Sequence, residues 1–188
     1  MTDDRLAATL AAIDAANAAD PDVSEGAPAA LLYGQRMTED LDRLFPDAPD
    51  RLRIAARGQH IERWTSPRSA YPEGKQGYLN WRRDLAAFHA RRVGEIMAAE
   101  GYGADEVERV GRMIRKEGIK RDPDVQALED VICFTFLRWY FKPFAAGRAP
   151  DALLKIVEKT ARKMSDSARA RALADFALPE PFAAAFRG

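Results

Sequence analysis

The sequence has little of several features that would assign it to a familiar class. It is 188 residues long, contains one cysteine and two histidines, and carries no net formal charge. A single cysteine excludes a disulfide framework, and because Cys133 lies in an apolar run we expect a buried, unreactive thiol. No apolar run approaches the roughly 20 residues that span a bilayer, and the N-terminus lacks a signal-peptide pattern. We therefore expect a cytoplasmic protein with no membrane partner.

Patterns typical of strands and of several enzyme classes are also missing. No run alternates in the β manner, no glycine-rich loop fits a Walker or dinucleotide motif, and no serine or cysteine has a nucleophile context. Apolar residues instead recur every three or four positions, which predicts an all-α, single-domain helical bundle over residues 1–188. The expected helices are 3–19, 28–45, 49–66, 78–101, 104–117, 123–146, 150–176 with a break at Ser165 and Asp166, and a short piece at 180–187.

One segment interrupts this helical pattern. Residues 65–77 contain Pro67, Pro72, Gly74 and Gly77. Such a stretch inside a helical domain is usually functional or disordered, and its aromatic and basic residues favour an ordered loop. We expect this loop to border a binding site.

The zero net charge is a cancellation between blocks of the chain. Residues 1–50 carry 11 acidic against 3 basic residues, residues 51–92 carry 3 against 10, and residues 93–188 carry 15 against 16. The middle block contains both histidines and the irregular loop. It predicts a basic surface that attracts a compact anion, in preference to a long nucleic-acid footprint.

Four metal-competent side chains share helical stripes with apolar residues, and these are His60, His89, Glu117 and Asp130. Burying such groups is costly, so they need mutual hydrogen bonds, basic partners or a cation. Two imidazoles with two carboxylates suit a divalent metal such as Mn, Fe or Zn. The alternative is that each is a separately satisfied core residue.

The basic block supplies a second signal, because arginine suits planar contact with phosphate. The candidate anion-binding residues are Arg57, Arg63, Arg68, Arg82 and Arg115. Aromatic residues interleave with them and could stack on a base, namely Trp64, Tyr71, Tyr78 and Trp81. The alternative for the two tryptophans is that they anchor the helices that flank the loop.

Several strings in this region are similar to an uncharacterised family. They are Arg-Gly-Gln-His-Ile-Glu-Arg-Trp at 57–64, Gly-Tyr-Leu-Asn-Trp-Arg at 77–82, Ile-Arg-Lys-Glu at 114–117 and Leu-Glu-Asp at 128–130. The chain resembles, over nearly its whole length, the domain of unknown function 4202 family of bacteria and fungi. That resemblance brings no established activity.

A second resemblance is to the HD-domain metal-dependent phosphohydrolases. Residues 31–37 and 54–64 look like the helices that carry the histidine and the His-Asp pair of that superfamily, and Asp130 falls at its later aspartate. Here Tyr33 or Gly34 stands at the first histidine, and Gln59-His60 replaces His-Asp. The resemblance implies either a rearranged ligand set or a scaffold that keeps an anion pocket without a metal.

Three hypotheses about function follow. The first is a metal-dependent phosphohydrolase for a small phosphorylated, nucleotide-type ligand, in which Glu62 or Lys116 assists proton transfer. The second is a non-catalytic protein that binds a nucleotide or RNA. The third is a helical interaction protein whose acidic first fifty residues pack against its own or a partner's basic block.

Overall fold

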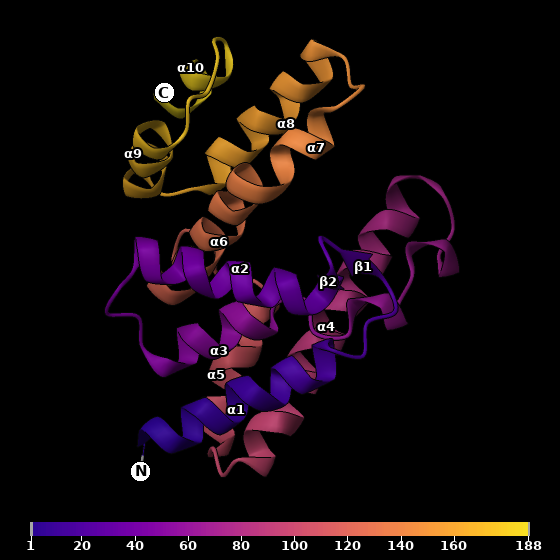
Figure 1. The fold of residues 1–188 in the computed structure, drawn as a ribbon, viewed down its shortest axis with the longest axis vertical. Helices are drawn as coiled ribbons and strands as arrows, with labels where there is room; N and C mark the ends of the chain where they lie inside the picture. Colours follow the sequence, from indigo (N-terminus) through magenta and orange to yellow (C-terminus); the bar gives the residue numbers. More distant parts are fainter. Residues whose placement is uncertain (1, 188) are drawn as a thin grey trace.

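The computed structural model describes residues 2–187, and its regular structure is almost entirely helical (Figure 1). The expected all-α bundle is confirmed. The helices are α1 (Thr2–Asn17), α2 (Ala29–Leu44), α3 (Asp50–Gly58), α4 (Gly74–Ala99), α5 (Ala104–Ile114), α6 (Pro123–Thr135), α7 (Phe141–Ala145), α8 (Pro150–Lys163), α9 (Asp166–Asp175) and α10 (Phe182–Arg187).

A small hairpin precedes α2 and was not expected from the sequence. Strands β1 (Val23–Ser24) and β2 (Ala27–Pro28) pair in antiparallel fashion. The turn between them places Glu25 and Gly26 at φ of 53° and 82°. Positive φ at both central residues is typical of the tight turn that joins two antiparallel strands. Two short strands leave the all-α class unchanged.

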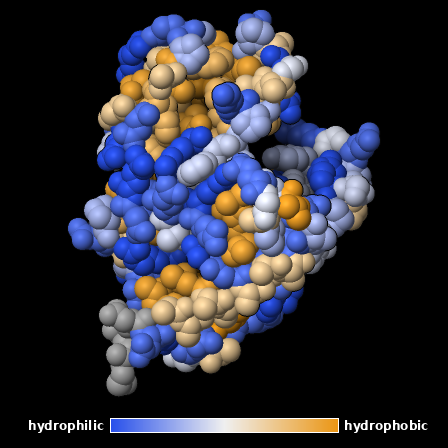
Figure 2. All heavy atoms as spheres, viewed as in Figure 1, coloured by the Kyte–Doolittle hydropathy of each residue, from blue (hydrophilic) through white to orange (hydrophobic). Residues whose placement is uncertain are grey.

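Helix α6 joins two hydrophobic cores (Figure 1). The larger core packs residues of α1 to α6, with Met37, Leu41 and Ile54 fully buried. The smaller core packs the end of α6 against α8, α9 and α10, around Phe134 and Met164. Figure 2 shows apolar residues gathered over these C-terminal helices on the face in view. Helix α6 therefore contributes side chains to both cores.

Two helix boundaries differ from the expected ones, and one expected break is present. Helix α3 ends at Gly58 and not at residue 66, while α4 already begins at Gly74. The predicted break at Ser165 is confirmed, because its hydroxyl accepts a hydrogen bond from the Ala168 N–H and caps α9.

The expected long helix 123–146 is interrupted. A π-helical turn spans Phe136–Tyr140 between α6 and α7. Pro143 cannot donate a backbone hydrogen bond and its ring would clash with the carbonyl of Trp139, four residues earlier, so a regular α-helix cannot continue. Turns of this type are rare and occur frequently at functional sites.

Among residues 2–187, no helix combines the length and apolar character needed to cross a bilayer.

Candidate functional site

His60 and Arg63 lie where three adjoining pockets meet. The first, of about 610 Å³, runs along α6 and α8 and is called the cationic cleft. The second, of about 280 Å³, is called the histidine pocket because His89 also lines it. The third, of about 490 Å³, is called the tryptophan pocket because Trp64 and Trp81 line it. A ligand that contacts His60 and Arg63 can extend into any of the three.

The end of α3 brings His60 to this place. At the buried Gly58, a Cβ atom would lie 2.4 Å from Cγ2 of Val93, so only glycine lets α3 approach α4 this closely. Beyond it, Ile61 is fully buried and anchors the turn. His60 therefore lies in a turn after α3, and not on the helical stripe that the sequence suggested.

The two predicted histidines come together. Their ring centroids are 5.8 Å apart, and the ring of His60 stacks on Tyr33 with centroids 4.2 Å apart. Arg63 Nη1 lies 3.2 Å from His60 Nε2. Because a guanidinium can only donate, Nε2 accepts this bond and a neutral His60 carries its proton on Nδ1.

Both imidazoles are held neutral. Burial lowers the pKa of His60 well below its ordinary value, and the charges of Arg63 and Arg82 act in the same direction. Burial likewise lowers the pKa of His89 to about 4. A backbone group of Ile61 counters part of that fall, yet neither His89 ring nitrogen has a partner at hydrogen-bond geometry within residues 2–187. Near pH 7 both rings can donate and accept hydrogen bonds without carrying charge.

Four cationic side chains line the cationic cleft, and they are Arg63, Arg82, Lys116 and Lys163. The carboxylate that lines it is Glu129, which is 1 % exposed and lies 2.6 Å from Lys116 Nζ and 3.4 Å from Lys163 Nζ. The charge of these lysines outweighs the effect of burial and lowers the pKa of Glu129. The cleft is therefore positively charged at neutral pH.

Arg63 and Arg82 have no carboxylate partner among the described residues. Burial lowers the pKa of Arg63, and the neighbouring charge of Arg82 lowers it further. Near them, Oε1 of Gln59 is buried without a hydrogen-bond partner in this part of the chain. Unpaired guanidinium groups beside unpaired polar atoms favour a bound anion.

The remaining predicted arginines have internal partners. Arg57 makes a bidentate ion pair with Asp14 at 2.6 and 2.7 Å. Arg68 donates to the backbone oxygens of Tyr71 and Pro72, which holds the irregular loop in shape. Arg115 lines the histidine pocket but pairs with Glu117 and Glu108. Of the five arginines predicted to bind an anion, Arg63 and Arg82 line the cleft and have no carboxylate partner among the described residues.

The four predicted metal ligands do not assemble. Glu117 is exposed and pairs with Arg115 and Arg112. Both oxygens of Asp130 accept hydrogen bonds from Ser165. Within residues 2–187, no three histidine, cysteine, aspartate or glutamate side chains are grouped as metal ligands would be. The interpretation of these four residues as one metal centre does not fit the geometry.

The prediction that Glu117 is a metal ligand fails for a local reason. Helix α5 ends at Ile114, and Lys116 then adopts a left-handed conformation with φ of 61°. The chain turns there, so the helical spacing that would have directed Glu117 inward does not apply. The same turn directs Lys116, one of the two predicted catalytic residues, into the cleft.

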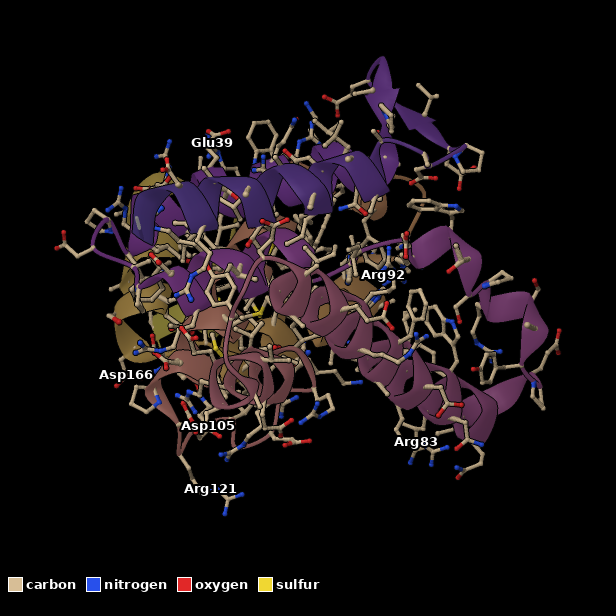
Figure 3. The ribbon with its side chains drawn as sticks, turned by 90° about the horizontal axis from the view of Figure 1, so that it is seen from below. Glu39, Arg83, Arg92, Asp105, Arg121 and Asp166 are labelled. Atoms are coloured by element: carbon tan, nitrogen blue, oxygen red, sulfur yellow. The ribbon has the colours of Figure 1, made fainter. Side chains whose placement is uncertain are left out.

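Glu62, the other predicted catalytic residue, faces α4. Its carboxylate accepts two hydrogen bonds from Arg92, at 2.7 and 3.2 Å. Figure 3 shows Arg92 at the side of α4 that faces the body of the protein, whereas Arg83 points away from it. Glu62 therefore ties the turn after α3 to α4, and it does not line the cleft.

The four aromatic residues predicted to stack on a base lie in different places. Tyr78 lines the cationic cleft and is 46 % exposed. Trp64 and Trp81 line the tryptophan pocket, but Trp81 is buried, donates to the Ser66 carbonyl and lies under Arg63. The hydroxyl of Tyr71 donates to Asp84. Trp81 thus anchors the loop, as the alternative interpretation had it.

Several residues that line the cleft were not singled out from the sequence as site residues, and they are Tyr33, Gln59, Glu129, Phe136, Tyr140, Phe144 and Lys163. A signal for Glu129 was present, because it shares a helical stripe with Val125, Ile132 and Phe136. Lys163 and Phe144 come from another part of the chain. No spacing within the sequence could have brought them to His60.

The fold and the site define an all-α protein with a positively charged cleft that ends in aromatic side chains. The chain belongs to the family described as "Domain of unknown function (DUF4202)", whose model matches residues 7–185. This confirms the family resemblance inferred from the motifs. Neither the comparison with curated proteins nor that with solved structures gave a match. The likeness to HD-domain phosphohydrolases stays a prediction.

Proposed function

We propose that this protein binds a small phosphorylated ligand of nucleotide type in the cationic cleft. The observation that carries the proposal is the pair Arg63 and Arg82, which face the cleft without a carboxylate partner among the described residues. Two guanidinium groups with free N–H donors match the oxygens of a phosphate group. Their mutual repulsion is relieved when a dianion binds between them.

Neutral groups around the two arginines complete the site. His60 carries a proton on Nδ1, while His89 and Gln59 have ring nitrogens and an amide oxygen without partners in the described part of the chain. Neutral donors and acceptors of this kind suit ribose hydroxyls or phosphate oxygens. Lys116 and Lys163 add positive charge along the cleft, although each is already paired with Glu129.

A compact anion fits this site better than RNA does. The cleft of about 610 Å³ lies within the range of about 300 to 1,000 Å³ typical of small-molecule sites. Many other arginines of the basic block, such as Arg53, Arg57 and Arg92, are used in ion pairs with this chain's own carboxylates. A long nucleic acid would need a continuous row of free basic side chains.

The test is titration calorimetry at low salt with AMP and inorganic phosphate. We expect Arg82→Gln to weaken AMP binding by about tenfold or more, because a hydrogen bond to a charged group contributes about 1.5 to 3 kcal/mol. The matched control is Arg91→Gln, since Arg91 lies on the same helix, is 61 % exposed, pairs with Glu95 and lines none of the three pockets. Equal weakening by both variants, or no binding of either ligand, would overturn the proposal.

Hydrolysis of the ligand is the alternative function. Because Glu117 and Asp130 have other partners, the structure offers less support for it than for binding. Phosphate release from AMP is therefore measured in parallel, with and without added Mn²⁺. The binding proposal expects AMP to be recovered intact in both conditions. Release that requires both His60 and His89 would favour the enzyme instead.

A further inference from the structure

The cationic cleft has two chemically different ends. Helices α6 and α8 run antiparallel (Figure 1), and Glu129 near the middle of α6 pairs with Lys163 at the end of α8. Moving away from this pair, the cleft is lined by Ile132 and Phe136 on one side and by Thr160 and Ile156 on the other. Seven residues of helix separate Glu129 from Phe136, which corresponds to roughly 10 Å. Charge therefore gives way to apolar surface along the cleft.

The apolar end is built from fixed aromatic rings. Phe136 and Phe144 meet edge to face with ring centroids 5.6 Å apart, and both are only half-buried. Phe141 packs behind them against Phe136 and Phe182, at 5.9 and 5.7 Å. The π turn and Pro143 set the positions of these rings on the chain. The guanidinium of Arg148 lies over one face of Phe144, 4.1 Å from the ring centroid, and the partly exposed surface of the two rings in the cleft lies next to the phosphate-binding end.

Polar side chains are sparse at this end. Thr160 lines it, but its hydroxyl donates to the Ile156 carbonyl at 2.9 Å. Tyr140 of the π turn also lines the cleft, and its ring lies against Tyr33 with centroids 5.8 Å apart. The other lining residues here are Ile132, Cys133, Phe136, Phe144 and Ile156. Reading the edge of a nucleobase requires donors and acceptors placed against it, whereas stacking requires only a ring face.

We propose that the ligand's organic part is a flat aromatic base that lies against Phe136 and Phe144 and is recognised by its faces and not by its edge. This inference rests on the proposed function, because the phosphate must bind at Arg63 and Arg82 for the base to reach these rings. The ligand class is then nucleoside phosphates, and the protein binds them with little preference for one base over another. The stacking role belongs to residues other than the tryptophans.

The first test compares related ligands by calorimetry on the wild-type protein. AMP, UMP and purine riboside 5′-monophosphate, which lacks the amino group of adenine, are each expected to bind about tenfold or more tightly than ribose 5-phosphate. AMP and the purine riboside are expected to agree within about threefold. Ribose 5-phosphate binding as tightly as AMP, or a preference of 100-fold for one base, would overturn the inference.

The second test removes one aromatic face at a time. Phe136→Leu and Phe144→Leu keep the volume apolar, and each should weaken AMP binding severalfold while leaving inorganic phosphate unaffected. The control is Phe182→Leu, which alters the same aromatic cluster without touching the cleft. AMP binding that is unchanged in both cleft variants would refute the base site. If inorganic phosphate still binds through Arg82 in that case, the proposed function survives; if no phosphate compound binds to the wild type, the proposed function has failed.

Discussion

Single side chains in the cleft show a conflict between stability and binding. Arg63 and Arg82 line the same cleft without a carboxylate partner among the described residues, and the charge of Arg82 lowers the pKa of Arg63. Lys116 adopts a left-handed backbone conformation. Neighbouring like charges and a strained backbone are each unfavourable, and such features concentrate at functional sites. The groups that hold the ligand are therefore expected to destabilise the free protein.

This conflict leads to a prediction at Arg82. Replacing it by glutamine removes the repulsion with Arg63, so the free protein should become more stable by a few tenths to about 1 kcal/mol. Urea denaturation of wild type and Arg82→Gln measures this difference. Arg91→Gln, which removes an exposed arginine on the same helix, should leave the free energy of unfolding nearly unchanged. A clear loss of stability in Arg82→Gln would show that Arg82 has a structural partner.

Among the elements, α6 organises most of the molecule. It contributes to both cores, lines the cleft through Glu129 and continues into the π turn that positions the aromatic end. Its Asp130 faces the other way and accepts hydrogen bonds from the backbone N–H and the hydroxyl of Ser165, at 2.7 and 2.6 Å. Adjacent residues of one helix thus line the cleft and hold the start of α9.

Asp130 separates the structural role from the metal-ligand role. In Asp130→Ala the donors of Ser165 lose their acceptor, which should cost about 1 to 3 kcal/mol of unfolding free energy. AMP affinity should not change, because Asp130 does not line the cleft. Asp166→Ala is the control, since that side chain is 96 % exposed beside Ser165. If Asp130→Ala lost AMP binding without losing stability, Asp130 would belong to the binding site after all.

The elements also show what could be predicted from the sequence. Helical periodicity correctly indicates the all-α class, and the Ser165-Asp166 pair correctly marks the break before α9. His60 and His89 do lie close together, although His60 lies in a turn and not on the helical stripe that the sequence suggested. Periodicity fails at Glu117, because α5 ends at Ile114 and the chain turns at the left-handed Lys116, where helical spacing no longer applies. It also gives no reason to pair Lys163 with Glu129, because that contact depends on how α8 lies against α6.

For the whole molecule, the cancelled net charge has a structural meaning. The acidic first fifty residues pair with the basic block of the same chain, as in Arg57 with Asp14 and Arg53 with Asp42. The intramolecular contact considered in the third hypothesis is therefore present. Carboxylates elsewhere in the chain pair with Arg51, Arg91 and Arg92 of the same block. The positive charge left free of carboxylates in the cleft lies at Arg63 and Arg82.

The buried histidines make the stability of the whole fold depend on pH. The pKa of His89 falls from 6.5 to about 4 on folding, so the unfolded chain binds more protons between these values. Stability should therefore decrease as pH falls through this window, by about 2 kcal/mol at pH 5 from His89 alone. Thermal unfolding of wild type and His89→Leu from pH 7.5 to 4.5 measures it. The variant should lose less stability on acidification, and parallel curves would contradict this account.

A crystal structure with AMP bound tests the central claim most directly. The account predicts the phosphate group within hydrogen-bond distance of Arg63 and Arg82, with the adenine ring against Phe136 and Phe144. A phosphate bound in the tryptophan pocket or elsewhere on the surface, with Arg63 and Arg82 uninvolved, would contradict it.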